Sequence, residues 1–317
     1  MGRSRPLEYQ LGRVLQTSKQ SKNTSGLTHK ARNNILHSFV KTLKADFGLK
    51  KLENLKFRHV EHQVQKWKSE GLSTGTLQNR ISHLRWLADR YGKNPMIPRS
   101  NVDLGISKRN VDYNTDKGWT PTKTTMENLP EPQQHHVNLM RYFGMRFEEA
   151  AKFKPEENLN GNRIDIVYGT KGDREREIHL DDKHRGEVRS FELIGKQLKI
   201  VEDLKEYLKG SRAESLSKEC DKYKKFENST RHQYKLSDMT KAGGGTPHGL
   251  RHQYAQDRYK ELTGKDAPAQ LKKSIRSEMR ASMSKDDWKT HKEALHKISN
   301  ELGHDRPYVT LNYIGKL

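Results

Sequence analysis

Residues 246–252 read TPHGLRH, and they predict both the start of a helix and the side chains on its first turn. The hydroxyl of Thr246 can cap free N–H groups, and proline suits the first helical position. His248 and Arg251 lie three residues apart and therefore share one face of that turn. Because a helix N-terminus attracts anions, a guanidinium and an imidazole at this place favour a phosphate-binding site. A capping histidine beside a surface arginine would fit the same residues.

A second stretch, residues 302–313, reads LGHDRPYVTLNY and predicts how a helix ends. Gly303 can adopt the left-handed conformation that terminates helices, which would fix the direction of His304. Tyr313 follows nine residues after His304. A tyrosine at such a place is commonly a packing residue, and Tyr308 is a rival for any chemical role. A phenol, with a pKa near ~10 in water, becomes a good nucleophile only where cations stabilise the phenolate.

Two cations far upstream complete this set. Arg146 lies within GMRFEE at residues 144–149. Lys171 lies within GTKGD at residues 169–173, between two alternating apolar stretches that predict a β-hairpin. Arg146 and Arg251 could both neutralise the non-bridging oxygens of a phosphate. The set therefore suits nucleophilic attack on a phosphodiester without a metal.

The composition points to a polyanionic partner. The chain has 317 residues and a formal net charge of +21, from 61 Lys and Arg against 40 Asp and Glu. A balanced solvated surface would not leave such an excess of one sign, so nucleic acid is favoured. No apolar run approaches the ~20 residues that span a bilayer, so we expect a cytoplasmic protein without a membrane partner. Cys220 is the single cysteine, which excludes an intrachain disulfide and a cysteine-only metal site.

The pattern of the chain predicts a basic arm and two domains. Residues 1–26 are polar and basic and predict a flexible arm with one short helix around Leu7–Leu15. Three helical patterns in residues 27–95 predict a compact bundle. Residues 96–132 are rich in proline and predict a linker leading into the second domain. Residues 133–317 combine helices, the first over 133–152, with the hairpin, and predict a mixed α/β domain.

Basic side chains lie on the outward faces of the predicted bundle. Contact with the DNA backbone and ordinary solubility explain them equally well. These side chains are Lys56, Arg58, Lys66, Lys68, Arg80, Arg85 and Arg90.

In this order GMRFEE, the hairpin lysine, HGLRH, LGH and a tyrosine nine residues later resemble the tyrosine recombinase (phage integrase) family. Residues 27–92 are similar to the family's core-binding domain. The resemblance implies a mainly α fold with a small β-sheet, in which an all-α, SAM-like core-binding domain precedes a mixed α/β catalytic domain. Each motif is loose by itself, and their joint occurrence in one order carries the resemblance.

The resemblance also implies the chemistry of the site. Tyr313 would attack the scissile phosphorus, forming a 3′-phosphotyrosyl bond and releasing a 5′-hydroxyl. Arg146 and Arg251 would clamp the phosphate, and Lys171 would protonate the departing 5′-oxygen. Because the covalent bond stores the phosphodiester energy, no ATP, cofactor or metal is expected.

Three further positions receive roles in the same way. His248 would act as general acid and base, and His304 would hydrogen-bond the phosphate. Glu149 would hold other residues of the site in place rather than take part in the reaction.

Two places depart from the family's pattern. The interval from Arg251 to His304 is long, and its excess around residues 262–292 predicts an inserted helical pair. This pair could contact DNA, a neighbouring protomer or solvent alone. Four residues follow Tyr313, so we do not expect the long C-terminal helix that some relatives donate to a neighbour.

The implied function is site-specific recombination of double-stranded DNA by a tetramer acting on two sites, for the integration or excision of a mobile element. DNA-bending or directionality proteins could assist it. A dimer-resolving recombinase, a type IB topoisomerase-like relaxer and a catalytically silent DNA-binding regulator stay open as alternatives. A pure binder, however, needs neither Tyr313 nor Lys171. A metal-dependent nuclease is disfavoured, because no acidic cluster stands near the histidines.

Overall fold

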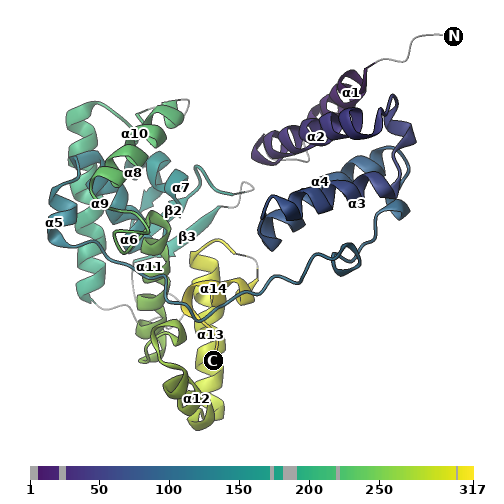
Figure 1. Ribbon diagram of the computed structural model, residues 1–317. Helices are drawn as coiled ribbons and strands as arrows, with labels where there is room; N and C mark the ends of the chain where they lie inside the picture. Colours follow the sequence, from purple (N-terminus) through teal and green to yellow (C-terminus); the bar gives the residue numbers. More distant parts are fainter. Residues whose placement is uncertain (1–5, 21–25, 172–174, 181–190, 219–221, 305) are drawn as a thin grey trace. The chain divides into compact units, whose positions relative to one another are not determined.

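The computed structural model describes residues 6–20, 26–171, 175–180, 191–218, 222–304 and 306–317 (Figure 1). The chain forms two compact units, Met1–Val111 and Asp112–Leu317. Within the described residues, no helix is both long and apolar enough to cross a membrane. Cys220, residues 172–173 of the predicted hairpin turn, and residues 1–5 and 21–25 of the predicted arm lie outside the described residues.

The N-terminal unit is built from helices around one core. Phe39, Trp67 and Ile81 come from three different helices and are buried together. The all-α fold predicted for this part of the chain is therefore confirmed. Its elements are α1 (Leu7–Gln20), α2 (Gly26–Phe47), η1 (Leu52–Asn54), α3 (Phe57–Ser69), α4 (Thr74–Arg90), η2 (Asn94–Met96) and η3 (Val102–Leu104).

Helix α1 corrects the prediction of a flexible arm. Leu7, Leu11 and Leu15 recur every four residues and are buried in the same core as the helices that follow. Gln10 fastens α1 to η1, because its side-chain oxygen accepts a hydrogen bond from the Leu52 N–H at 2.9 Å. The short helix predicted around Leu7–Leu15 is confirmed, but the prediction of a flexible arm is wrong for Leu7–Gln20. A short leucine stripe has little stability as an isolated helix but gains it by packing.

The N-terminal unit also extends into the predicted linker. Ile97, Leu104 and Ile106 are buried in its core. The Lys68 ammonium donates a hydrogen bond to the Leu104 carbonyl at 3.2 Å. The first part of residues 96–132 therefore belongs to the N-terminal unit, and the C-terminal unit begins at Asp112.

The C-terminal unit contains a small antiparallel sheet that confirms the predicted hairpin. Its described strands are β1 (Leu159–Asn160), β2 (Arg163–Ile166) and β3 (Arg176–His179), in the order β1-β2-β3. Ile164 pairs with Ile178, and both side chains are buried, so this face of the sheet points into the core. The sheet is small, and the unit is mainly helical, as predicted.

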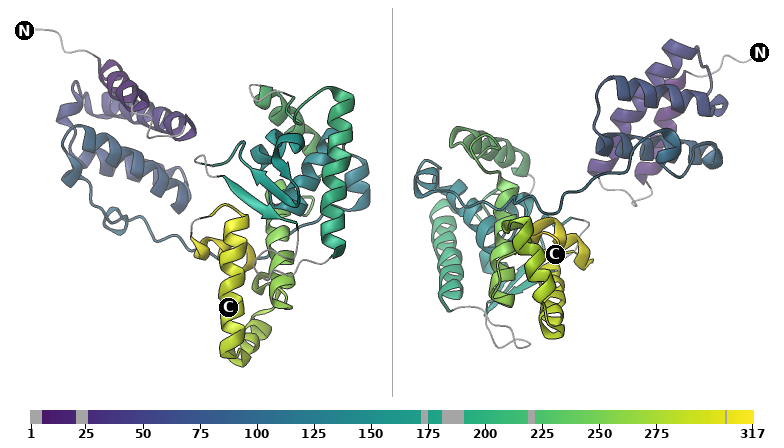
Figure 2. Two further views of the ribbon diagram at one scale, coloured as in Figure 1. Left: turned by 180° about the vertical axis from the view of Figure 1, so that it is seen from behind. Right: turned by 60° about the horizontal axis from the view of Figure 1, so that its bottom comes forward.

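Helix α11 (Pro247–Thr263) is the central element of this unit. It contacts α6 (Glu131–Phe143), α13 (Lys285–Glu301) and α14 (Leu311–Ile314), and Figures 1 and 2 show α11 and α13 side by side. The mainly helical character predicted for residues 247–313 is confirmed. The remaining elements are α5 (Lys123–Glu127), α7 (Phe147–Lys152), α8 (Pro155–Asn158), α9 (Phe191–Ser211), α10 (Tyr223–Leu236), η5 (Pro268–Gln270), α12 (Lys273–Ser282) and η6 (Pro307–Thr310).

Candidate active site

A break between α6 and α7 positions the first arginine of the site. The prediction of one helix over residues 133–152 is wrong, because Gly144 adopts a left-handed conformation with φ +58° and ends α6. Gly144 is required there, since a Cβ would lie 2.5 Å from the ring of Tyr254. Arg146 then precedes α7, where its backbone N–H donates to Glu149 Oε2 at 2.6 Å. Its guanidinium donates to Glu149 Oε1 at the same distance.

Glu149 is fully buried and binds a second arginine that the sequence analysis missed. Arg176, on β3, donates from Nη1 and Nη2 to the two carboxylate oxygens at 2.6 and 2.7 Å. Burial alone would raise the pKa of Glu149. The hydrogen bonds and charge of Arg176, together with the charges of Arg251 and Arg146, outweigh it and hold this pKa at about 2. Glu149 is therefore an anion that binds Arg146 and Arg176.

Arg251 is the most deeply buried cation of the site. The predicted start of α11 is confirmed: the Thr246 hydroxyl accepts from Gly249 N–H, and Pro247 occupies the first turn. Arg251 lies one turn later, is 0% exposed, and donates to the carbonyls of Gly144 and Leu302. Burial, and then the nearby charges of Arg176 and Arg146, lower the pKa of Arg251 to about 10, so it stays protonated at neutral pH.

The end of α13 places His304 beside Arg251. Gly303 has φ +62°, as predicted, and the backbone N–H of His304 donates to the Ser299 carbonyl at 2.8 Å. The Nε2 atom of His304 lies 3.5 Å from Nη2 of Arg251. Burial, followed by the charges of Arg251 and Arg146, lowers the pKa of His304 to about 3. The imidazole is therefore neutral at physiological pH.

Tyr313 lies at the centre of these groups. Its side chain comes from α14, and the residue is 9% exposed. The guanidinium carbon of Arg251 lies 5.7 Å from the centre of its ring, and the ring of His304 lies 5.4 Å away. Its rival Tyr308 is 55% exposed and pairs with Arg306, at 2.7 Å from its guanidinium. The structure therefore favours Tyr313 over Tyr308 as the tyrosine of the site.

Two histidines of α11 face the same tyrosine. The His248 and Tyr313 rings lie 5.9 Å apart, and His248 keeps part of its surface exposed to solvent. Partial burial of the ring, followed by the charges of Arg251 and Arg146, lowers the pKa of His248. His252, which the sequence analysis quoted but gave no role, is closer, at 4.6 Å from the Tyr313 ring, and is buried. Its position four residues after His248 on the same helix face was the available signal.

Lys171 is the remaining predicted residue. It lies in the connection between β2 and β3 and is exposed. Among the described residues, no hydrogen bond or ion pair joins it to the residues around Tyr313. The structure thus brings together Arg146, Glu149, His248, Arg251, His304 and Tyr313, and leaves Lys171 at the surface.

The electrostatics of the cluster suit an anion. Three guanidinium groups, from Arg146, Arg176 and Arg251, surround the single carboxylate of Glu149, which leaves an excess of positive charge beside Tyr313. The neighbouring imidazoles of His248 and His304 are neutral at physiological pH, so they add no charge to this excess, and each can donate a hydrogen bond from one ring nitrogen and accept one at the other. Such a site can neutralise a phosphate diester and stabilise a phenolate that attacks it.

The basic residues proposed for DNA contact in the N-terminal unit differ in their exposure and in their contacts with that unit. The Arg85 guanidinium donates to the Pro98 carbonyl at 2.6 and 3.0 Å and to Asn101 Oδ1 at 2.8 Å, so it stabilises the unit's own fold. Arg80 lies over the Trp67 ring. The exposed members are Lys56, Arg58, Lys66 and Arg90, whereas Lys68, Arg80 and Arg85 are half-buried.

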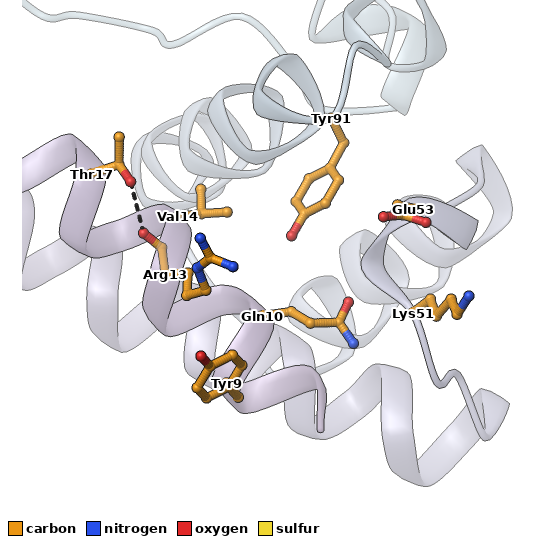
Figure 3. Close-up of a pocket in the computed structure, with 8 residues that line it drawn as sticks. All are labelled: Tyr9, Gln10, Arg13, Val14, Thr17, Lys51, Glu53 and Tyr91. Atoms are coloured by element: carbon orange, nitrogen blue, oxygen red, sulfur yellow. Dashed lines mark hydrogen bonds between the residues drawn. The ribbon is translucent and has the colours of Figure 1, made fainter. Parts of the chain in front are cut away.

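A cavity of about 420 Å³ opens in the N-terminal unit, between α1, η1 and the end of α4 (Figure 3). Tyr9, Arg13, Glu53 and Tyr91 line it, with other polar side chains. None of the candidate catalytic residues belongs to this lining. We assign no reaction to this cavity, because its walls are a mixture of polar and apolar side chains.

Two family models match the chain. A model described as phage integrase, N-terminal, matches residues 9–97, and a model described as integrase matches residues 122–257. The second match contains Arg146, Lys171, His248 and Arg251. No curated protein sequence matches the chain significantly.

Several solved structures share the fold at low sequence identity. A lambda integrase dimer bound to a COC′ core site has 14% identity and a TM-score of 0.58, over 98% of this chain and 77% of that chain. A lambda integrase tetramer bound to a Holliday junction has 13% identity and a TM-score of 0.54, over 92% and 78% of the two chains. The Tn1549 transposon integrase in complex with transposon right end DNA has 12% identity and a TM-score of 0.54, over 96% and 94%.

Proposed function

The chain belongs to the tyrosine recombinase (phage integrase) family, and we propose that it cuts and rejoins DNA at specific sites through a covalent bond to Tyr313. The observation that carries this proposal is the placement of one buried tyrosine beside Arg251 and His248 of α11 and beside His304, which follows α13. A tyrosine that served packing alone would not need an excess of positive charge around it.

The first step is an attack by the Tyr313 hydroxyl oxygen on the phosphorus. His248, whose lowered pKa keeps it neutral, accepts the phenolic proton as the oxygen–phosphorus bond forms. Arg146 and Arg251 neutralise the non-bridging oxygens, and His304 donates a hydrogen bond to one of them. The bond to the 5′-oxygen breaks, and Lys171 gives that oxygen its proton, leaving a 3′-phosphotyrosyl enzyme.

The reverse step uses the same groups. The 5′-hydroxyl of a partner strand gives its proton to Lys171 and attacks the phosphorus, the bond from phosphorus to Tyr313 breaks, and His248 returns the phenolic proton. Because the phosphodiester energy is kept in the covalent bond, neither ATP nor a metal enters the balance. Positioning and electrostatics thus account for the catalysis.

The partner we propose is double-stranded DNA with two recombination sites, held by four copies of the chain at the nucleoid. The lambda integrase structures, described as a dimer on a core site and a tetramer on a Holliday junction, support this assembly. The exposed cations Lys56, Arg58, Lys66 and Arg90 would contact the DNA backbone. The biological task would be integration or excision of a mobile element, with accessory proteins that bend DNA, and dimer resolution is the alternative.

Covalent trapping tests the proposal. The wild-type protein and Tyr313→Phe are incubated with nicked duplexes that include the ends of the element encoding the gene, and denatured in detergent. We expect DNA attached through a 3′-phosphate in the wild type and none in Tyr313→Phe, with equal DNA binding by both. Salt-sensitive binding without any adduct in the wild type would instead support a silent DNA-binding regulator.

A further inference from the structure

The main chain at Tyr313 is held by a residue of α11 that plays no part in the chemistry described above. Gln256 is 0% exposed, and its Nε2 donates to the Tyr313 carbonyl at 3.3 Å. The same nitrogen donates to Asp116 Oδ1 at 2.7 Å. A side-chain amide has two N–H groups, so it can make both hydrogen bonds at once. Gln256 therefore links Asp116 to the backbone of the nucleophile.

A second hydrogen bond fastens the chain just beyond the tyrosine. The backbone N–H of Lys316 donates to Asn114 Oδ1 at 2.7 Å. Asn114 and Asp116 both belong to the segment Asp112–Gly118, which thus reaches the Tyr313 carbonyl through Gln256 and binds the backbone beyond α14 directly. Helix α14 has four residues, which is too short to hold its own conformation by internal hydrogen bonds.

The segment Asp112–Gly118 is shaped to make these contacts. The Asp112 carboxylate accepts from the Asn114 N–H at 2.9 Å and from the Thr115 hydroxyl at 2.5 Å. Asp116 Oδ1 also accepts from the Gly118 N–H at 2.8 Å. Such local turns fix the directions of the Asn114 and Asp116 side chains.

Gly118 brings the segment close to α11. A Cβ at this position would lie 2.1 Å from Gln256 Oε1 and 2.7 Å from Gln253 Oε1, so a side chain there would push the amide of Gln256 aside. The close approach of Gly118 and the hydrogen bonds to Asp116 and Tyr313 thus all involve Gln256.

We infer that Asn114, Asp116 and Gln256 are positioning residues that hold the Tyr313 segment in the cleavage-ready conformation of its own subunit. The inference rests on the proposed function of Tyr313. Asp112 follows Val111, the last residue of the N-terminal unit. The chain that leaves the N-terminal unit therefore continues directly into the residues that hold the nucleophile.

The first test measures whether Asp116 holds the segment, without requiring DNA cleavage. Asp116 is exposed, so its substitution should leave the fold intact. In Asp116→Ala, amide hydrogen exchange in peptides covering residues 308–317 should rise by on the order of tenfold. Asp116→Asn, which keeps the acceptor oxygen, and Asp103→Ala, which removes an exposed carboxylate elsewhere, should exchange like the wild type. Unchanged exchange in Asp116→Ala would overturn the inference.

The second test asks whether this contact serves the reaction. Single-turnover cleavage of a nicked duplex at saturating protein should fall by on the order of tenfold or more in Asp116→Ala, and further when Asn114→Ala is added. The Kd for the duplex should match that of Asp103→Ala, since both variants lose one negative charge. A cleavage rate equal to that of Asp103→Ala would refute the positioning role. A wild type that forms no adduct would refute the proposed function instead, while the exchange measurement would still decide whether the segment is held.

Discussion

The arginines around Tyr313 and the cations of helix α12 carry the same charge in opposite surroundings. Arg251 and Arg176 are 0% and 7% exposed, and their guanidinium groups are fixed by carbonyls and by Glu149. Helix α12 has no buried residue, and Lys273 and Arg280 are exposed. Desolvated, oriented charge can stabilise one arrangement of a phosphate, whereas solvated charge attracts any polyanion and is screened by salt. The first region should therefore set the rate of the chemistry, and the second the strength of DNA binding.

The largest effect should come from Arg251→Lys. A lysine keeps the charge but lacks the planar guanidinium that donates to the Gly144 and Leu302 carbonyls. The positive charge would then no longer be held in a fixed position relative to the phosphate and Tyr313. We expect single-turnover cleavage to fall on the order of a thousandfold with little change in DNA affinity. Arg280→Lys on α12 is the matched control and should cleave like the wild type. Equal rates for the two variants would remove the distinction between buried and exposed cations.

The stability of the site should depend on pH through Glu149. Its pKa is about 2 in the folded chain, below the ordinary value of 4.5, so the stabilisation is complete above pH ~4.5 and is lost as the pH falls towards 2. This loss should amount to about 3 kcal/mol. Urea unfolding between pH 6 and 2.5 should show this extra pH dependence in the wild type and in the control Glu177→Gln, which alters an exposed carboxylate. It should be missing in Glu149→Gln, and parallel curves for all three proteins would contradict the buried ion pairs.

Lys171 is an exception to the division between buried catalytic cations and exposed binding cations, because it is exposed and yet has a chemical role in the proposed mechanism. Lys171→Ala should lower cleavage on the order of a hundredfold, since the 5′-oxygen would leave without a proton. A 5′-bridging phosphorothiolate substrate, whose sulfur leaves without protonation, should restore the rate. If the sulfur substrate brought no recovery, Lys171 would belong with the exposed binding cations of α12.

The smallest effect should come from α12. Lys273→Gln combined with Arg280→Gln should weaken binding to a random duplex severalfold and reduce the slope of log K against log salt by about 0.9 for each lost phosphate contact. Lys285→Gln with Lys289→Gln removes the same charge from exposed positions on α13 and serves as the control. Identical slopes for both pairs, measured by fluorescence anisotropy, would make α12 an ordinary solvated helix.

The sequence signals that succeeded are local ones. Thr246-Pro247 marks the start of α11, and Gly303 marks the end of α13 just before His304. Both signals are local because caps and left-handed glycines act within one turn. The docking of α1 on the N-terminal core and the role of Arg176 were not predictable in this way. Arg176 looks like an ordinary strand residue, and its partner Glu149 lies 27 positions away, on a different element. Tertiary packing assigns both, and a single sequence does not reveal it.

The central claim is that Tyr313, and not another tyrosine, forms the covalent bond to DNA. The direct measurement is mass spectrometry of the trapped adduct after digestion of both protein and DNA, with Tyr308→Phe as the matched control. We predict a nucleotide 3′-phosphate attached to Tyr313, in the wild type and in Tyr308→Phe alike. A modified Tyr308, or an adduct that persists in Tyr313→Phe, would contradict the account.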